Sequence, residues 1–275
     1  MALAVAEPLA DRVIAIAETR ELDVFAALLE RRGARVLRYP LVRIVDAPDP
    51  APVLGWLRAF ADRGCDDLIL LTGEGLRRML RCIELHEPAL RAPFLVALSA
   101  VRKITRGPKP ARALRELGLS SDLAAEPPTT SGVIETLGHL DWHGRRVGVQ
   151  LYGEEPNRVL IEFLQAAGAQ VSSVAPYRYA KAASDSAVRD LLLRLRAGQI
   201  DAIAFTSKAQ VERLFGLAPE DSVREALAAT QVAAVGPVVA EALAAHGVAI
   251  GTMPQSAWFM KPLTAALSEL LAERA

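Results

Sequence analysis

The stretches Asp67-Leu-Ile-Leu-Leu-Thr-Gly-Glu74 and Asp201-Ala-Ile-Ala-Phe-Thr-Ser-Lys208 share one pattern, although 134 residues separate their threonines. In each stretch, a near-continuous apolar run is followed by a threonine and then by sequence compatible with a helix. Such runs are typical of parallel strands that are covered on both faces, because half-buried strands alternate apolar and polar residues. The pair therefore predicts the same strand–turn–helix unit at two places in the chain.

The repeat extends to three further kinds of landmark: strand starts, helix-ending glycines and Gly-Pro turns. The paired positions are Val13 and Val147, Gly33 and Gly168, and Gly107 and Gly236, at offsets of 134, 135 and 129 residues. A glycine suits the end of a helix because it tolerates a positive φ angle. Strands that alternate with helices in this order predict an α/β protein built twice, as two doubly wound parallel-sheet domains.

Three segments are interpreted as connections between these elements. They are the turn-rich segment 46–52, the Pro127-Pro128 break before a helix capped by Thr130 or Ser131, and the polar segment 177–185. None of the three is long enough to be a flexible tether.

Length and composition exclude several classes of protein. The 275 residues carry 32 Lys plus Arg against 32 Asp plus Glu, and 52% of them are hydrophobic. Such a chain can bury a large core and differs from a disordered one. The balanced charge argues against nucleic-acid binding, which draws on an excess of basic residues. Two cysteines, Cys65 and Cys82, are too few for a disulfide scaffold in so long a chain.

The compartment is predicted from the N-terminus and from the apolar runs. No secretory signal is evident, because Glu7 and Asp11 interrupt the first apolar stretch and no basic segment precedes it. No window approaches the roughly 20 apolar residues of a membrane-spanning helix. We therefore expect a cytoplasmic protein that does not contact a membrane. Among the four histidines, only His139 and His143 are close, in a glycine-flanked loop, so no metal site is expected.

The turns that follow the strands are the predicted ligand-binding segments. In open α/β sheets, ligands bind at the carboxyl ends of the strands, near helix N-termini whose free N–H groups favour anions. These turns provide hydroxyl groups, backbone amides and cations at Arg20, Thr72, Arg106, Gly107, Lys109, Gly153, Thr206, Ser207, Lys208, Gly236 and Pro237. A cleft between two such domains suits a small molecule with several carboxylates. The plainer alternative is that the Gly-Pro pairs and single arginines serve only turn geometry and solvation.

Two further features restrict the kind of ligand. Neither a Walker-type phosphate loop nor a Gly-x-Gly-x-x-Gly motif after the first strand is present, so no nucleotide cofactor is expected. Glutamates also occur in the ligand-facing turns, so these turns are not uniformly basic. They are Glu18, Glu74, Glu154 and Glu155.

These landmarks resemble those of the uroporphyrinogen-III synthase family, from Val13 to about Leu271. The order and spacing of the motifs, more than any one motif, carry the resemblance. The motifs are Thr19-Arg20, Gly33, Pro40, Thr72, Tyr177, Phe205-Thr-Ser207, Val235-Gly-Pro237 and Gly247. The resemblance implies two α/β domains joined by a two-stranded linker, with the active site in the cleft between them.

The resemblance also implies a domain division and a reaction. The domains are residues 1–40 with 178–275, and residues 41–177. The family is one of cyclising lyases of tetrapyrrole and heme biosynthesis, and no metal or organic cofactor is implied. Its substrate is hydroxymethylbilane, a linear tetrapyrrole polycarboxylate. The enzyme promotes loss of the terminal hydroxyl, attack through a spiro intermediate, inversion of ring D and closure to uroporphyrinogen III. We expect this substrate to be the only partner and the chain to be monomeric.

Site roles follow from the same resemblance. Tyr177 is the predicted catalytic residue, since a tyrosine at the matching position is the family's favoured hydrogen-bond donor to the departing hydroxyl. The alternative is a linker tyrosine that packs one face of its ring and exposes its hydroxyl to water. Two sets of groups are expected to bind the substrate carboxylates. The hydrogen-bond donors are Thr206, Ser207 and Lys208, and the ion partners are Arg20, Arg106 and Lys109.

Departures from the family pattern leave other functions open. Val238 and Val239 stand where the family commonly has threonines, and Gly107-Pro-Lys-Pro110 likewise lacks the usual threonine. The alternative function is therefore a non-catalytic, ligand-sensing domain of the same fold, related to a transcriptional regulator. A small-molecule binding protein of the periplasmic type is a third possibility, but the expected signal peptide is missing.

Overall fold

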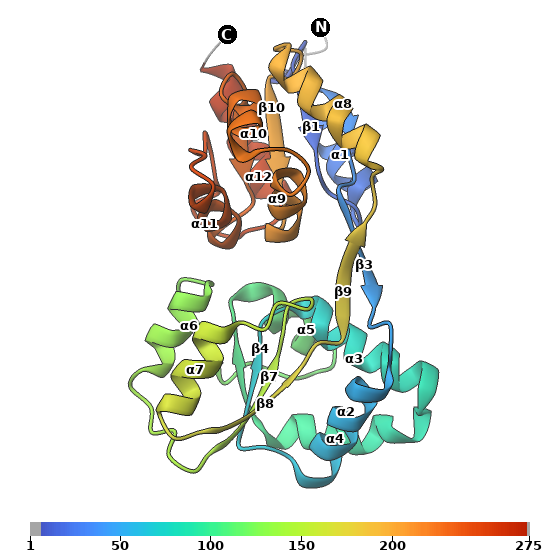
Figure 1. Ribbon diagram of the computed structural model, residues 1–275, viewed down its shortest axis with the longest axis vertical. Coiled ribbons are helices and arrows are strands. Elements are labelled where there is room, and N and C mark those ends of the chain that lie inside the picture. The colour runs from blue at the N-terminus through green and yellow to red at the C-terminus, as the bar shows by residue number, and fades with distance from the viewer. Residues whose placement is uncertain (1–6, 274–275) are drawn as a thin grey trace, which may run out of the picture. The chain divides into compact units, whose positions relative to one another are not determined.

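The computed structural model describes residues 7–273, which divide into two compact units (Figure 1). The split unit combines the residues up to Arg43 with those from Ala180 onward, and the continuous unit is Ile44–Tyr179. The chain leaves the split unit within β3 (Val42–Asp46) and returns to it within β9 (Tyr177–Lys181). These two strands pair as a two-stranded sheet.

The continuous unit contains a five-stranded sheet in the order β6-β5-β4-β7-β8, and all of its strands are parallel. The strands are β4 (Asp67–Leu70), β5 (Arg102–Thr105), β6 (Leu123–Ala124), β7 (Arg146–Gln150) and β8 (Gln170–Val174). The helices are α2 (Ala51–Arg63), α3 (Gly73–His86), α4 (Arg91–Ala100), α5 (Pro108–Arg115), α6 (Thr130–Leu137) and α7 (Arg158–Ala166), with a 3₁₀ turn η1 at Pro88–Leu90.

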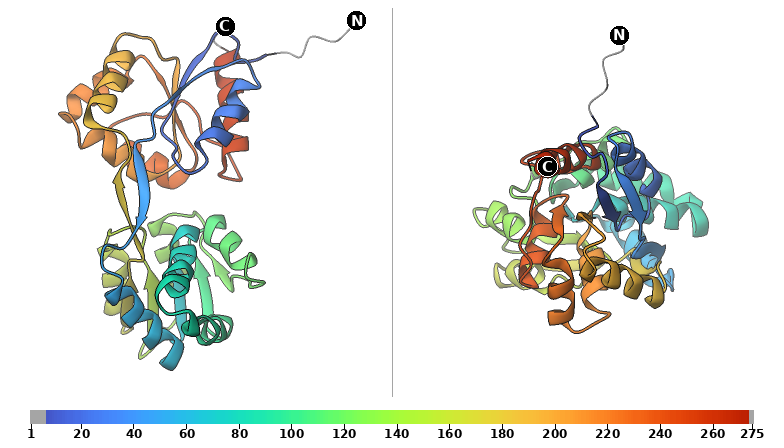
Figure 2. Two further views of the ribbon diagram at one scale, coloured as in Figure 1. Left: turned by 90° about the vertical axis from the view of Figure 1, so that its right-hand side faces the viewer. Right: turned by 90° about the horizontal axis from the view of Figure 1, so that it is seen from above.

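Helices cover both faces of this sheet, as Figures 1 and 2 show. Successive residues of β4 point to opposite faces. Leu68 and Leu70 pack into a cluster formed with α2, α3, α4 and α5, whereas Ile69 packs into a second cluster with α6 and α7. All four residues of β4 are buried, which explains the continuous apolar run in the sequence. A doubly wound sheet is therefore confirmed in this unit.

The split unit contains a four-stranded sheet in the order β11-β10-β1-β2, again entirely parallel. The strands are β1 (Val13–Ile16), β2 (Arg35–Arg38), β10 (Ala202–Phe205) and β11 (Gln231–Ala234). The helices are α1 (Leu22–Glu30), α8 (Asp185–Arg196), α9 (Lys208–Phe215), α10 (Glu220–Leu227), α11 (Pro237–Ala245) and α12 (Met260–Ala272).

The two sheets are circular permutations of one pattern. The order β5-β4-β7-β8 in one unit matches β11-β10-β1-β2 in the other. In the continuous unit, β6 pairs with β5. At the equivalent place in the split unit, an isolated parallel bridge pairs Thr252 with Ala233 of β11. In the continuous unit the β7–α7–β8 segment follows α6, whereas its counterpart β1–α1–β2 comes from the start of the chain. The internal repeat predicted from the sequence is confirmed, and the permutation explains why one unit is split.

Local predictions at the helix ends are largely confirmed. Gly33 and Gly168, just after α1 and α7, have φ angles of 93° and 89°, which glycine adopts without strain. The cap of α6 differs from the prediction of Thr130 or Ser131. Thr129 is the capping residue, and its hydroxyl accepts a hydrogen bond from the Gly132 N–H at 3.1 Å. The helix begins at Thr130, so its cap lies one residue before the first predicted position and two before the second.

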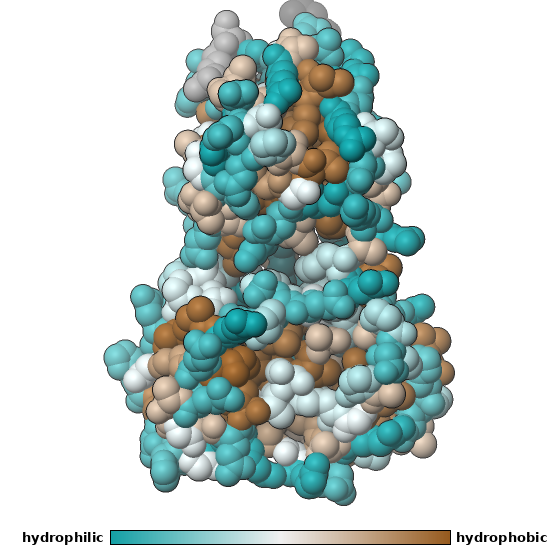
Figure 3. All heavy atoms as spheres, viewed as in Figure 1, coloured by the Kyte–Doolittle hydropathy of each residue, from teal (hydrophilic) through white to brown (hydrophobic). Residues whose placement is uncertain are grey.

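The surface of both units mixes hydrophobic and hydrophilic residues on the face seen in Figure 3. Single exposed apolar side chains are normal on a protein surface. The large exposed ones lie on different elements, at Val24, Leu85, Val96, Val159 and Leu193. No helix within residues 7–273 is long and apolar enough to cross a membrane.

Candidate functional site

The predicted site residues of the continuous unit all follow carboxyl ends of its strands. Thr72 comes after β4, the turn from Arg106 to Lys109 after β5, Gly153 after β7 and Tyr177 after β8. Because the strands are parallel, these segments share one edge of the sheet. The predicted site residues of this unit therefore lie at the same edge of its sheet.

Tyr177 contacts Thr72 directly. The Tyr177 hydroxyl lies 3.2 Å from Thr72 Oγ1 and 3.5 Å from the Tyr179 hydroxyl. Tyr177 is only 1% exposed, which excludes the alternative of a linker tyrosine with a solvated hydroxyl. Burial raises the pKa of Tyr177, and hydrogen bonds with Thr72 and Tyr179 and the charge of Arg106 only partly oppose that rise. The hydroxyl therefore keeps its proton at neutral pH.

Gln150 supports Thr72 from the neighbouring strand and was not predicted. Its Oε1 accepts a hydrogen bond from the Thr72 N–H at 3.1 Å, and its Nε2 donates to Thr72 Oγ1 at 3.4 Å and to the Leu151 carbonyl. Gln150 is completely buried. A Cβ at Gly75 would lie 1.8 Å from Gln150 Nε2, so glycine is needed there for the amide to fit.

The remaining predicted residues of this unit shape the same edge. The Arg106 guanidinium lies 4.7 Å from the ring centroid of Tyr152, a cation–π contact. Gly107 precedes α5 with φ 77°, and a Cβ there would lie 2.3 Å from Pro128. The carbonyl of Lys109 packs so closely against Gly73 that a Cβ would meet it at 2.5 Å. These close approaches bring the starts of α3 and α5 together.

The split unit holds the other predicted residues at the equivalent edge of its sheet. Arg20 follows β1, the turn from Thr206 to Lys208 follows β10, and Gly236 and Pro237 follow β11. The two sets of predicted residues thus belong to different units, at equivalent positions of the repeat.

Glu18 organises the turns after β1 and β10. Its Oε1 accepts hydrogen bonds from the Thr19 and Arg20 N–H groups, both at 2.9 Å, and its Oε2 accepts one from the Thr206 hydroxyl. Glu18 is 6% exposed. Burial opposes ionisation, but the hydrogen bonds from Thr206, Thr19 and Arg20 outweigh it and lower the pKa of Glu18. The sequence showed a glutamate in a ligand-facing turn but did not show that it is buried and ionised.

Gln210 gives Thr206 the same support that Gln150 gives Thr72. Its Oε1 accepts from the Thr206 N–H at 2.7 Å, and its Nε2 donates to Thr206 Oγ1 at 2.9 Å. Gln210 also forms a capping box with Ser207, which fixes the start of α9 immediately before Lys208.

Trp258 covers the Gly236 turn. Gly236 has an extended backbone, with φ 176°, so its conformation needs no glycine. A Cβ there would nevertheless lie 2.8 Å from Cβ and Cγ of Trp258. The buried Trp258 Nε1 has no hydrogen-bond partner among the described residues. Pro237 occupies the first turn of α11, where its missing N–H costs nothing.

Comparison with known proteins gives the family. The family model described as uroporphyrinogen-III synthase HemD matches residues 23–261. The chain belongs to the uroporphyrinogen-III synthase family. This result confirms the resemblance seen in the sequence, and with it a family of cyclising lyases of tetrapyrrole biosynthesis.

Relatives and solved structures agree over nearly the full length. The uncharacterized protein YjjA of Bacillus subtilis is 32% identical over 240 residues, which cover 86% of this chain and 87% of that protein. A mutant uroporphyrinogen III synthase from Thermus thermophilus superposes with a TM-score of 0.77 at 28% identity, over 95% of this chain and 99% of its own. The wild-type Thermus enzyme gives 0.60 at 29% identity, over 96% and 99%.

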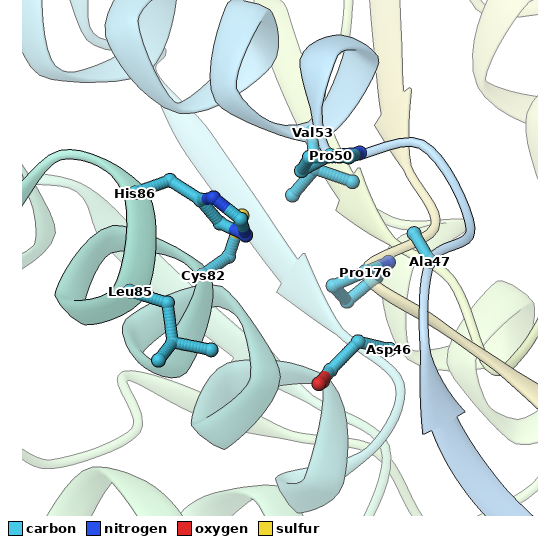
Figure 4. Close-up of a pocket in the computed structure, with 8 residues that line it drawn as sticks. All are labelled: Asp46, Ala47, Pro50, Val53, Cys82, Leu85, His86 and Pro176. Atoms are coloured by element: carbon cyan, nitrogen blue, oxygen red, sulfur yellow. The ribbon is translucent and has the colours of Figure 1, made fainter.

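The continuous unit also contains a small pocket. It is lined by Asp46, Ala47, Pro50, Val53, Cys82, Leu85, His86 and Pro176 (Figure 4). Its volume of about 20 Å³ has room for little more than a water molecule. None of the predicted site residues lines it. Over residues 7–273, no cluster of three or more His, Cys, Asp or Glu side chains could hold a metal ion.

Proposed function

We propose that this chain is a uroporphyrinogen-III synthase, which cyclises hydroxymethylbilane to uroporphyrinogen III with inversion of ring D and loss of water. The likeness to the Thermus thermophilus synthase, over 95% of this chain and at 28% identity, carries the proposal. The family match over residues 23–261 supports it independently. No feature of the described residues favours the ligand-sensing alternative.

Tyr177 is the proposed hydrogen-bond donor to the departing hydroxyl. As the carbon–oxygen bond breaks, negative charge develops on that oxygen, and a fixed donor in a buried site stabilises it. The proton released at the carbon joined during ring closure balances the hydroxide, so that one water is lost overall. The raised pKa of Tyr177 supports the role, because a phenol that stays neutral remains a donor.

The helix N-termini and cations at the two sheet edges are the proposed binding groups for the acetate and propionate side chains. In the continuous unit, these are the starts of α3 and α5, with Arg106 and Lys109. In the split unit, they are the starts of α9 and α11, with Lys208 and Arg20. The Thr206 hydroxyl already donates to Glu18, so its proposed role is to hold the turn. Binding of this kind would position a flexible polyanion for closure.

We further propose that the enzyme acts as a monomer in the cytoplasm, with the two units as its domains and without nucleic acid. The equal numbers of basic and acidic residues support the last point. Size-exclusion chromatography with light scattering measures the oligomeric state directly. A dimer mass at micromolar concentration would contradict the monomer.

The activity is tested by coupling to porphobilinogen deaminase. The coupled mixture is supplied with porphobilinogen, its products are oxidised, and the porphyrin isomers are separated. Isomer III is expected in the presence of the protein, because hydroxymethylbilane closes without help to isomer I. Isomer I alone would overturn the proposal.

Two tyrosine variants test the assigned donor. Tyr177→Phe should reduce the rate of isomer III formation by roughly 100-fold, as for other lost donors to a developing oxyanion. Tyr39→Phe is the matched control, since the Tyr39 hydroxyl binds Asp190 on the split unit. Equal rates for the two variants would remove Tyr177 from the mechanism but leave the activity in place.

A further inference from the structure

The orientation of the Gln150 amide is fixed by its neighbours. The Thr72 N–H can only donate, so the atom facing it must be the amide oxygen, Oε1. The Leu151 carbonyl can only accept, so the atom facing it must be Nε2. Both requirements select the same orientation. Nε2 therefore also faces Thr72 Oγ1, at 3.4 Å.

This orientation determines the direction of the hydrogen bond between Thr72 and Tyr177. A hydroxyl group has one proton to donate and two lone pairs to accept with. Thr72 Oγ1 accepts from the Gly75 N–H at 3.0 Å and from Gln150 Nε2, so both lone pairs are engaged. Its proton is left for the Tyr177 oxygen at 3.2 Å. Thr72 is therefore the donor and Tyr177 the acceptor.

The proton of Tyr177 is then available for a better acceptor. Because the Tyr177 oxygen accepts the Thr72 proton, the phenol proton of Tyr177 is not used in that bond. Its remaining partner within the described residues is the Tyr179 hydroxyl at 3.5 Å, longer than a usual O–H···O bond. We propose that Gln150 is a positioning residue, which holds Thr72 as a one-way donor and so keeps the Tyr177 proton for the substrate. This inference rests on the proposed function.

The other half of the repeat shows the same arrangement independently. Gln210 accepts from the Thr206 N–H and donates to Thr206 Oγ1, and Thr206 in turn donates its proton to Glu18. A carboxylate can only accept, so the direction of that last bond is certain. Gln150 comes from a neighbouring strand and Gln210 from the following helix, yet both produce a threonine that donates in one direction.

Gln150→Glu tests the inference because, at almost constant volume, it removes the amide N–H groups that donate to Thr72 Oγ1 and to the Leu151 carbonyl. An ionised Glu at position 150 can accept from Thr72 but cannot donate to it. The Thr72 hydroxyl would then donate its proton to the new carboxylate. The Tyr177 hydroxyl would donate to Thr72 and would no longer be available to the substrate. A protonated Glu donates as the amide does. Burial and the facing Leu151 carbonyl both disfavour the ionised form, so the pKa of such a carboxyl should be raised.

The expected result is a new pH dependence of kcat. At pH 8 the variant should form isomer III about tenfold more slowly than the wild type, with KM little changed. The rate should recover as the pH falls toward 6, after correction for spontaneous isomer I. Gln165→Glu is the matched control, since Gln165 is exposed on α7 in the same unit. Wild-type kcat for Gln150→Glu at every pH would overturn the inference.

Gly75→Ala provides a second perturbation from the opposite side. The new Cβ would displace the Gln150 amide, the end of a flexible side chain, whereas alanine favours the helix itself. A folded protein with kcat lowered about tenfold is expected. Gly55→Ala in α2 is the control, because nothing lies within 4 Å of a Cβ there. If circular dichroism shows that Gly75→Ala folds and kcat is unchanged, the inference fails.

A readout without catalysis separates this inference from the proposed function. The ¹³Cζ resonance of Tyr177, assigned with Tyr177→Phe, reports whether the hydroxyl accepts or donates. It should shift in Gln150→Glu at pH 8 and not in Gln165→Glu. An unshifted resonance overturns the role of Gln150 even if isomer III forms. If the wild type forms no isomer III, the proposed function fails and with it the role in catalysis.

Discussion

The hydroxyl of Thr206 donates a hydrogen bond to the buried carboxylate of Glu18, although the two residues are 188 positions apart in the chain. The same carboxylate accepts the N–H groups of Thr19 and Arg20. One side chain from the start of the chain therefore fixes both its own turn and the turn after β10. In a circularly permuted unit, this contact joins segments that the repeat predicts to be neighbours but that the chain does not connect directly.

Glu18→Gln should reduce stability at neutral pH by about 1.5–3 kcal/mol, the usual contribution of hydrogen bonds to a charged group. The pKa of Glu18 is lower in the folded protein than its ordinary value of 4.5. Its contribution is therefore present above pH 4.5 and is lost as the pH falls through the folded-state pKa. Urea unfolding from pH 7 to pH 3 should show the wild type and the variant converging at low pH.

Glu225→Gln is the control for that titration, since Glu225 is exposed on α10 of the same unit. Its unfolding free energy should parallel that of the wild type at each pH. A constant difference between Glu18→Gln and the wild type down to pH 3 would contradict the assignment of Glu18 as an ionised, hydrogen-bonded group.

Ionisation of Tyr177 should not limit the activity below pH 10. Burial raises the pKa of Tyr177 above its ordinary value of 10.0, so the phenol remains a donor throughout the neutral and mildly alkaline range. The rate of isomer III formation, measured from pH 7 to pH 10, should show no loss attributable to Tyr177. A midpoint below pH 10 that disappears in Tyr177→Phe would contradict this.

Those features of the fold that depend on local sequence could be predicted. The apolar runs of β4 and β10 identified buried parallel strands, because each residue of such a strand meets a covering helix. Gly33 and Gly168 identified helix ends, because a positive φ angle is a property of the residue itself. Turns at the strand ends followed from these elements and from the parallel topology. Because every landmark occurred twice, each half of the repeat supported the interpretation of the other half.

Contacts between distant segments could not be predicted in the same way. Gln150 lies 78 positions from Thr72, and nothing in the apolar end of β7 indicates that its amide binds a backbone N–H. Gln210 could have been found, since a serine followed three residues later by glutamine is a capping-box pattern. Glu18 was identified only as a glutamate in a ligand-facing turn, because its burial depends on β10, which comes much later in the chain.

Gly153→Ala should destabilise the continuous unit by about 2–3 kcal/mol. Gly153 has φ 61°, and a Cβ there would lie 2.9 Å from the ring of Tyr179. Gly144→Ala is matched in backbone strain, with φ 69°, but no atom lies within 4 Å of its Cβ, so it should cost only about 1 kcal/mol. Urea unfolding measures the loss of unfolding free energy in each variant. Equal losses in Gly153→Ala and Gly144→Ala would mean that Tyr179 moves aside freely.

Gly236→Ala should displace Trp258 without straining the backbone. The extended conformation of Gly236 is open to any residue, so the nearest obstacle is the Trp258 side chain, 2.8 Å from the new Cβ. Tryptophan emission should shift to longer wavelength as the indole becomes more exposed. Trp56 and Trp142 also emit, so the same substitution is made in a Trp258→Phe background, where no shift is expected. A shift of equal size in both backgrounds would come from Trp56 and Trp142 in the continuous unit, and would contradict a local effect on Trp258.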